Sequence, residues 1–302
     1  MLEPRETRPD LASLRAHVCA RMDAMFESLL AIPDAPNARL YAAIRHATIG
    51  GGKRLRPLLV LLSGRLFGVP EAAALRAGLA VEAIHAHSLI HDDLPCMDDD
   101  DLRRGRPTVH KAFDEATAVL AGDSLLALAF EILADPQTHP DAAIRSALVV
   151  SLSRAAGPAG MAGGQMIDIC APALSLDLAG VTQLQRLKTG ALLAWSIEAG
   201  AILGRAPEAK RRRLASYAAC LGLIFQIADD LLDCEGEEAK AGKRIGKDEA
   251  AGKRTFVSLL GSEGARRKAE ALCDEAIGHL APFGADGALL GEVAEFALTR
   301  DH

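Results

Sequence analysis

The sequence has few aromatic residues, which make up 4% of its 302 positions. Alternating runs rich in β-branched residues are also scarce, whereas Ala and Leu, which favour helices, are frequent. These two features exclude a β-sandwich and predict an all-α fold. The six cysteines form no C-x-x-C pair and no zinc-ribbon spacing. This pattern excludes a disulfide scaffold and predicts reduced cysteines in a cytoplasmic protein.

The sequence also lacks an excess of basic residues and long apolar runs. The 34 basic and 40 acidic side chains give a net charge of −6, which disfavours nucleic acid and anionic membrane surfaces as partners. No run of 18 apolar residues occurs, and no apolar segment follows the charged N-terminal sequence MLEPRETRPD. We therefore expect no nucleic-acid partner, no membrane span and no export.

Apolar residues recur at helical spacing along almost the whole chain. Two segments, 79–94 and 214–234, are apolar on most faces, as expected for helices at the centre of a bundle. Since no stretch resembles a linker, we predict one domain over residues 1–302, a large helical bundle around a central cavity. The expected helices span 11–31, 37–49, 55–68, 71–94, 112–134, 141–156, 181–204, 208–234, 254–261, 264–281 and 286–300.

Both central helices end in paired aspartates, in the sequences HDDLPCMD and ADDLLD. Asp229 and Asp233 are four residues apart and therefore share a helical face. Pro95 ends the first helix, so Asp98 must fold back from a loop to meet Asp92. Carboxylates are hard oxygen ligands, suited to Mg²⁺ shared with substrate phosphates. Two matching clusters behind apolar helices favour a cation site over two solvated helix ends, because unpartnered buried carboxylates are costly.

Other metal sites and a nucleotide site fit the sequence poorly. Glu82 and His85 form one Glu-x-x-His motif, but a di-iron bundle needs two. His87 and His91 have the spacing of zinc ligands, yet the Glu of the His-Glu-x-x-His motif is absent. The P-loop pattern is absent as well, so a nucleoside triphosphate is not indicated.

Two basic clusters accompany the acid clusters, GGGKRLRP at 50–57 and RRG at 103–105. Lys and Arg suit the oxygens of phosphate. Two acid and two basic clusters predict two phosphorylated ligands, one held through metal and one held directly by cations. Six aspartates and a diphosphate repel one another strongly without metal. Three Mg²⁺, with Arg103, Lys188 and Lys243, balance this charge.

The motifs GGKRLRP, HDDLPCMDDDDLRRGRPTVH, GGQMID, KTGALL, FQIADDLLD and GKRIGKDEAAGK resemble, in order and spacing, the short-chain trans-isoprenyl diphosphate synthases of the polyprenyl synthetase family. The resemblance is strongest to bacterial farnesyl diphosphate synthases. It implies an all-α isoprenoid synthase fold and a homodimer. The implied reaction is head-to-tail condensation of isopentenyl diphosphate with dimethylallyl or geranyl diphosphate to give farnesyl diphosphate. A geranylgeranyl diphosphate synthase, a non-catalytic partner subunit and a terpene cyclase are the alternatives.

The resemblance also assigns site residues position by position. The Mg²⁺ ligands, for about three ions with Mn²⁺ as a substitute, would be Asp92, Asp93, Asp98, Asp229 and Asp233, with Asp230 completing the second motif. The groups on the allylic diphosphate would be Arg103, Lys188 and Lys243. The isopentenyl diphosphate pocket would contain Lys53, Arg56, His85 and Arg104. Thr189 and Gln226 would line the path of the allylic carbocation, and Lys253 is a further substrate-binding candidate.

Chain length in this family depends on side-chain bulk just before the first acid motif. Similar farnesyl-forming enzymes have an aromatic residue five positions before the first Asp, where this chain has His87, followed by Ser88. These two positions lie about 6 to 7.5 Å below Asp92 along a helix, where a C15 tail should end. We expect mainly C15 product. Because the two-residue insertion in the first motif also occurs in geranylgeranyl synthases, C20 stays open.

Overall fold

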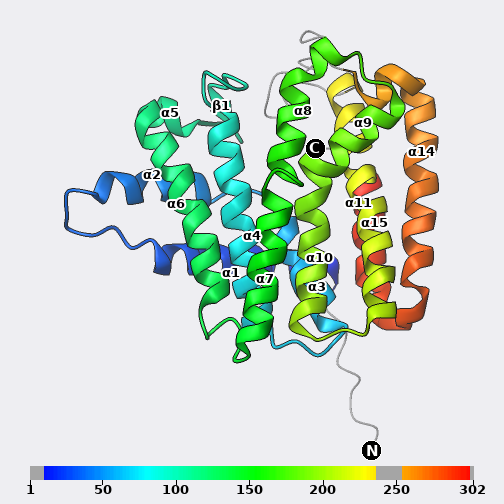
Figure 1. Ribbon diagram of the computed structural model, residues 1–302, viewed down its shortest axis with the longest axis horizontal. Helices are drawn as coiled ribbons and strands as arrows, with labels where there is room; N and C mark the ends of the chain where they lie inside the picture. Colours follow the sequence, from blue (N-terminus) through cyan, green and yellow to red (C-terminus); the bar gives the residue numbers. More distant parts are fainter. Residues whose placement is uncertain (1–9, 236–253, 300–302) are drawn as a thin grey trace, which may run out of the picture.

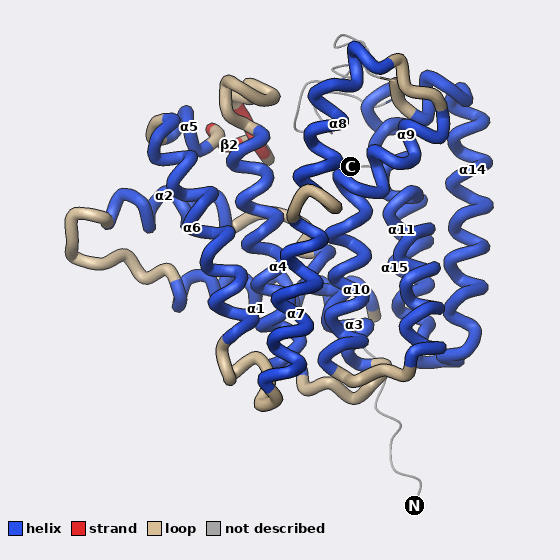
Figure 2. The backbone as a smooth tube through the Cα atoms, in the orientation of Figure 1, coloured by secondary structure: helices blue, strands red, loops and turns tan. Residues whose placement is uncertain are grey.

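The computed structural model describes residues 10–235 and 254–299. Within these ranges the chain is almost entirely helical, which confirms the predicted all-α class (Figures 1 and 2). The α-helices are α1 (Leu11–Leu29), α2 (Ala38–Thr48), α3 (Leu55–Arg65), α4 (Glu71–Asp92), α5 (Val109–Ala112), α6 (Glu115–Ala134), α7 (Ala142–Ala156), α8 (Met161–Leu174), α9 (Leu178–Gln185), α10 (Ala191–Leu203), α11 (Glu208–Glu235), α14 (Phe256–Leu280) and α15 (Ala288–Thr299). The remaining elements are a π-helical turn η1 (Arg186–Gly190), a 3-10 turn η2 (Ala281–Gly287) and an antiparallel pair β1 (Leu102–Arg103) and β2 (Arg106–Pro107).

Short polar side chains fix where several helices begin. Asp114 accepts a hydrogen bond from the backbone of Thr117 and so caps α6, and Asp177 caps α9 in the same way. At α14, Thr255 and Ser258 form a reciprocal capping box. These caps satisfy backbone N–H groups that have no partner inside the helix.

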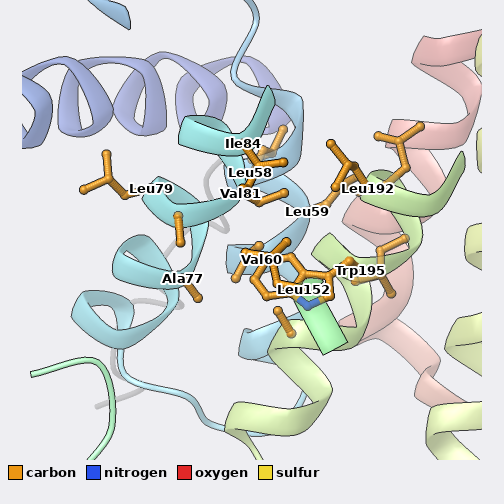
Figure 3. Packing of buried hydrophobic residues seen from close by; sticks show 14 of the residues in the cluster. Leu58, Leu59, Val60, Ala77, Leu79, Val81, Ile84, Leu152, Leu192 and Trp195 are labelled. Carbon is orange, nitrogen blue, oxygen red and sulfur yellow. The ribbon is translucent and has the colours of Figure 1, made fainter. Parts of the chain in front are cut away.

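The core forms where α3, α4, α7 and α10 pack together. Figure 3 shows Trp195 of α10 among buried aliphatic side chains such as Val60 and Leu152. Its indole N–H donates to Ser151 Oγ at 2.8 Å, so its polar atom is satisfied despite burial. Helices α3 and α10 approach so closely that a Cβ on Gly200 would lie 2.2 Å from Ser63 Oγ. This packing holds α4, which carries the first acid motif, against the rest of the bundle.

The connections beside the acid motifs gather at one end of the bundle. In Figure 1 the β1–β2 hairpin lies at the same end as α8 and α9. Helix α4 ends at Asp92, and the hairpin follows after the loop 93–101, which contains the rest of the first acid motif. The arrangement therefore brings the first acid motif and the two arginines that follow it to one end of the molecule.

The structure adds one helix, α8, between the predicted helices 141–156 and 181–204. The glycines at 157–164 suggested a break, but α8 begins at Met161 and includes Gly164. A Cβ at Gly164 would lie 2.2 Å from the backbone nitrogen of Lys188, so glycine is needed for close packing of α8 on η1. The predicted helix 181–204 is confirmed as a continuous helical run that comprises α9, the π-helical turn η1 and α10.

Further along the chain, α14 consists of two helical segments that meet at a kink, and these segments confirm the two predicted helices 254–261 and 264–281. It bends at Gly261, whose φ of 68° lies in the region that favours glycine. The helix expected at 286–300 is present as α15.

Two described helices, α6 and α11, are long and apolar enough to cross a membrane by length and composition alone. In α11, 67% of the most apolar window is buried inside the protein, as in a core helix. The corresponding share in α6 is 39%, and Val119 and Leu120 are among its exposed side chains. Helix α6 thus packs on α4 with one face and leaves apolar side chains exposed on another.

Candidate active site

The first acid motif curls back over the end of α4. The backbone N–H of Asp98 donates to the carbonyl of Asp92 at 2.8 Å, and that of Asp100 donates to the carbonyl of Asp93 at 3.2 Å. These bonds confirm the return of the loop that was predicted from Pro95. Asp98 is thereby brought back beside the last turn of α4.

The carboxylates of this motif crowd one another in a partly buried position. Burial raises the pKa of Asp92 to about 6, and the nearby charges of Asp98 and Asp93 add to the rise, while Lys188 and Arg103 oppose it. Burial also raises the pKa of Asp93. Arg103 opposes that rise, because its guanidinium contacts Asp93 through Nε at 2.7 and 3.0 Å and through Nη2 at 2.6 Å. Two adjacent aspartates thus differ in their partners.

The second acid motif lies near the end of α11, and its three aspartates have different surroundings. Asp230 is buried, accepts from Gln226 Nε2 at 2.8 Å and accepts from the backbone N–H of Phe256 at 2.8 Å. Thr189 Oγ donates to Gln226 Oε1 at 3.2 Å. Asp230 therefore ties α11 to α14 and, through Gln226, to η1. Asp229 and Asp233 are partly exposed and one helical turn apart.

Lys188 reaches the site from η1, and its partner Asp168 was not predicted. The ammonium of Lys188 contacts Asp168 Oδ2 of α8 at 2.7 Å, and its charge also acts on Asp92. Close packing of Gly164 on the backbone of Lys188 sets the two helical segments in this register. The one sequence signal for Asp168 was its place in the GGQMID motif.

The predicted isopentenyl side of the site is a cluster of cations around His85. Burial lowers the pKa of His85 well below its ordinary value, and the charges of Arg56, Arg104 and Arg103 lower it further, so the imidazole is neutral. Arg104 lies against Gly52, where a Cβ would be 2.6 Å from its Nη1. In this structure the glycine therefore makes room for an arginine.

Arg56 in this cluster connects the two halves of the site. Within the described part of the chain, its buried Nε atom has no hydrogen-bond partner. Burial lowers the pKa of Arg56, and the negative charges of Glu82 and Asp229 act in the opposite direction. Because the charge of Asp229 acts on Arg56, the basic cluster of α3 lies close to the acid motif of α11. Lys53, at the loop before α3, is half-buried.

Arg54, between Lys53 and Arg56, has a different role that the sequence did not reveal. Its side chain is buried and donates to Glu82 at 2.8 Å, to Asp23 at 2.7 Å and to the carbonyl of Thr48. Its backbone is left-handed, with φ of 48°. Arg54 therefore anchors the loop that presents the basic cluster.

A cavity opens between α2, α4 and the β1–β2 hairpin. Its lining includes polar and charged residues of the predicted site, namely His85, Asp93, Arg103 and Arg104. Its lining also includes the apolar residues Ile49, Ala86, Leu89, Ile90 and Val109. The cavity therefore offers both kinds of contact that a ligand with a charged group and an apolar chain requires.

The chain-length candidates lie one turn below the first acid motif. His87 Nδ1 is 3.0 Å from the carbonyl oxygen of Gly122 in α6, and its ring centre is 4.5 Å from that of His91. Burial lowers the pKa of His87, so the ring is neutral and donates to that carbonyl. Ser88 Oγ donates to the carbonyl of His85 at 2.9 Å. The side chain of His87 thus fills space between α4 and α6. Lys243 and Lys253 lie outside the described residues.

Comparison with known proteins defines the class of this site. The polyprenyl synthetase family model matches residues 37–282. A farnesyl diphosphate synthase of Geobacillus stearothermophilus is 45% identical over 267 residues, which cover 88% of this chain and 90% of that protein. The chain belongs to the polyprenyl synthetase family.

Solved structures agree with this family in fold. The apo crystal structure of an FPP/GFPP synthase from Zymomonas mobilis has a TM-score of 0.88 and 50% identity, covering 96% of this chain and 99% of that chain. A geranyltransferase of Helicobacter pylori, complexed with magnesium and isoprenyl diphosphate, has a TM-score of 0.83 and 30% identity, covering 97% and 98%. These matches confirm the expected isoprenoid synthase fold.

Proposed function

We propose that this chain is a trans-prenyltransferase that joins isopentenyl diphosphate head to tail with dimethylallyl or geranyl diphosphate and forms farnesyl diphosphate. The observation that carries the proposal is the pairing of two acid motifs with a separate basic cluster whose buried Arg56 Nε has no partner among the described residues. The resemblance to a farnesyl diphosphate synthase over 88% of the chain supports it.

The acid motifs fit Mg²⁺ by the chemistry of their donors. Crowding and burial raise the pKa of Asp92 to about 6, and a nearby cation relieves both effects. The residues proposed to hold about three ions, Mg²⁺ or in its place Mn²⁺, are Asp92, Asp93, Asp98, Asp229 and Asp233. Bound magnesium in the Helicobacter pylori relative supports this assignment. When bound, such ions stabilise the negative charge of a departing diphosphate.

The cations beside the acid motifs orient the allylic substrate. Arg103, held by Asp93, and Lys188, held by Asp168, present charge to the diphosphate oxygens. Lys243 and Lys253 are proposed to add to this charge from outside the described residues. Charge fixed in place before ionisation is usually the largest catalytic contribution. Thr189 and Gln226, which are hydrogen-bonded to each other, are proposed to border the carbocation.

The basic cluster holds the second substrate without metal. Arg56 Nε gains an acceptor when a diphosphate oxygen binds, and Lys53 and Arg104 supply further charge. Neutral His85 is proposed to donate a hydrogen bond to the same group. Binding here holds the isopentenyl double bond against the carbocation in near-attack geometry. The proton lost at the end of condensation passes, we propose, to the released diphosphate.

The two-pocket arrangement separates this function from its rivals. A terpene cyclase binds one diphosphate and has no use for the cluster of Lys53, Arg56 and Arg104. A non-catalytic relative usually loses acidic or basic site residues, whereas this chain keeps them. We further propose a single domain and a cytoplasmic homodimer. The exposed Val119 and Leu120 of α6 belong to the proposed contact between the two copies.

Product analysis tests the function. We expect labelled isopentenyl diphosphate and geranyl diphosphate to give mainly a C15 product by chromatography in Mg²⁺, and none in EDTA. Asp229→Asn should strongly lower the rate of product formation, whereas Asp274→Asn, the same change at an exposed position of α14, should not. Full turnover in metal-free enzyme is incompatible with the proposed metal role. Absence of any condensed product in Mg²⁺ refutes the function.

A further inference from the structure

A second group of metal-binding side chains lies away from the proposed active site, between α11 and α14. The ligand atoms of Cys220, Glu275 and His279 all lie within 4.8 Å of one another. The two helices pack side by side, as the yellow and orange ribbons of Figure 1 show. Glu275 and His279 are one turn apart on α14, and both meet Cys220 of α11. None of these three residues belongs to a motif that the sequence showed.

The spacing of the three donors suits a tetrahedral ion. In a tetrahedral zinc site with ordinary bond lengths, the donor atoms are about 3.4 to 3.6 Å apart. His279 Nε2 and Glu275 Oε1 are already 3.5 Å apart. Cys220 Sγ lies within 4.8 Å of both, so a small side-chain rotation completes the geometry. Thiolate, imidazole and carboxylate together are typical of zinc rather than of Mg²⁺ or Ca²⁺.

The burial of these side chains leaves one side of the group open. Cys220 is buried with 5% exposure, the side chain of His279 is 21% exposed, and that of Glu275 is 60% exposed. An ion bound here would therefore be reached from solvent past Glu275, and water would supply its fourth ligand. Burial raises the pKa of the Cys220 thiol to about 11, and the Glu275 charge raises it further, while Arg186 acts in the opposite direction.

We propose that Cys220, Glu275 and His279 bind one zinc ion, which links α11 to α14. On binding, the Sγ–H bond breaks, its proton passes to solvent and a zinc–sulfur bond forms, with no change of oxidation state. Affinity therefore rises with pH. The link adds to the contact that Asp230 makes with α14 through the backbone of Phe256.

The zinc site is separate from the proposed magnesium site. Cys220 precedes Asp229 by nine residues, which places it about 13.5 Å away along α11 and on the opposite side of the helix. The inference is therefore independent of the proposed function. Its test uses no substrate, so its failure leaves the condensation chemistry untouched.

Cobalt titration of the full chain tests the site, because Co²⁺ bound to a thiolate gives a charge-transfer band in the near ultraviolet. Excess Mg²⁺ occupies the aspartates during the titration. We expect a band that saturates at one Co²⁺ per chain and disappears when Zn²⁺ is added. Cys220→Ser should abolish the band, and His279→Gln should weaken cobalt binding by at least about tenfold.

Matched cysteine variants locate the thiolate. Cys273→Ser changes a second buried thiol, which lies in α14, and should leave the band intact. Cys96→Ser and Cys234→Ser change exposed thiols beside the two acid motifs, and they should leave it intact too. No band in the wild type, a band that survives Cys220→Ser, or a band lost in Cys96→Ser or Cys234→Ser overturns the proposal. If Cys220→Ser does not fold, as judged by circular dichroism, the His279→Gln titration decides the matter.

Discussion

Replacing Asp92 by Asn should stabilise the metal-free protein while removing its activity. Asn has nearly the same shape as Asp but carries no charge, so it resembles the protonated carboxyl. The folded protein holds the pKa of Asp92 at about 6, against an ordinary value of 3.8. At about 1.36 kcal/mol per pKa unit, the charged form costs the fold up to about 3 kcal/mol at neutral pH. Asp92→Asn removes this cost.

The sign of the pH dependence follows from linkage. Between pH 3.8 and about 6, the folded protein binds more protons at Asp92 than the unfolded chain does, so stability falls as pH rises through this range. The gain from Asp92→Asn should therefore be about 3 kcal/mol at pH 7.5 and only about 1 kcal/mol at pH 4.5. Added Mg²⁺ should stabilise the wild type more than the variant, because the variant has lost a proposed ligand.

Urea unfolding in EDTA at the two pH values measures this effect. Glu270→Gln makes the same change of carboxylate to amide at an exposed position of α14 and should shift stability by less than about 0.5 kcal/mol. The reasoning is wrong if Asp92→Asn destabilises the protein at pH 7.5. It is equally wrong if the gain does not shrink at pH 4.5.

Three further predictions concern the neighbouring residues. Arg54→Met leaves the buried Glu82 unpaired and should lower the free energy of unfolding by about 3 to 5 kcal/mol. The double variant Arg54→Met, Glu82→Gln should recover part of this loss. Equal urea midpoints for the single and the double variant would count against this network. Arg56→Ala should raise KM for isopentenyl diphosphate about 10- to 100-fold, with little change in KM for the allylic substrate. Asp229→Ala should mainly lower kcat. If each variant changes the kinetics of both substrates equally, the assignment of two pockets is wrong. His87→Ala should shift the product from C15 toward C20 and Ser88→Phe toward C10, measured by chromatography; an unchanged distribution in His87→Ala would place the end of the product cavity elsewhere.

The sequence predicts the parts of the site that depend on local geometry. Pro95 after an apolar helix was sufficient to predict that Asp98 returns toward Asp92, and the backbone bonds confirm it. The spacing of Asp229 and Asp233 predicted one helical face in the same way. Such features need only the rise and period of a helix and the restriction that proline imposes.

The features that escaped prediction depend on packing between distant segments. Asp168 and Lys188 meet because Gly164 admits the backbone of η1, a contact between two helical segments that no local periodicity encodes. Arg54 and Arg56 stand in one basic motif, yet one is buried in ion pairs and the other has an unpartnered Nε within the described chain. Arg54 also has a left-handed backbone, which the sequence of the motif does not show.

Calorimetric binding of each diphosphate, with and without metal, tests the two proposed substrate pockets most directly. We predict that isopentenyl diphosphate binds in EDTA and that Arg56→Ala weakens this binding about 10- to 100-fold. We also predict that geranyl diphosphate binds only with Mg²⁺ and that its binding survives Arg56→Ala. If both ligands need Mg²⁺ to the same degree, or if Arg56→Ala weakens both equally, the division into a metal-held and a directly held substrate is wrong.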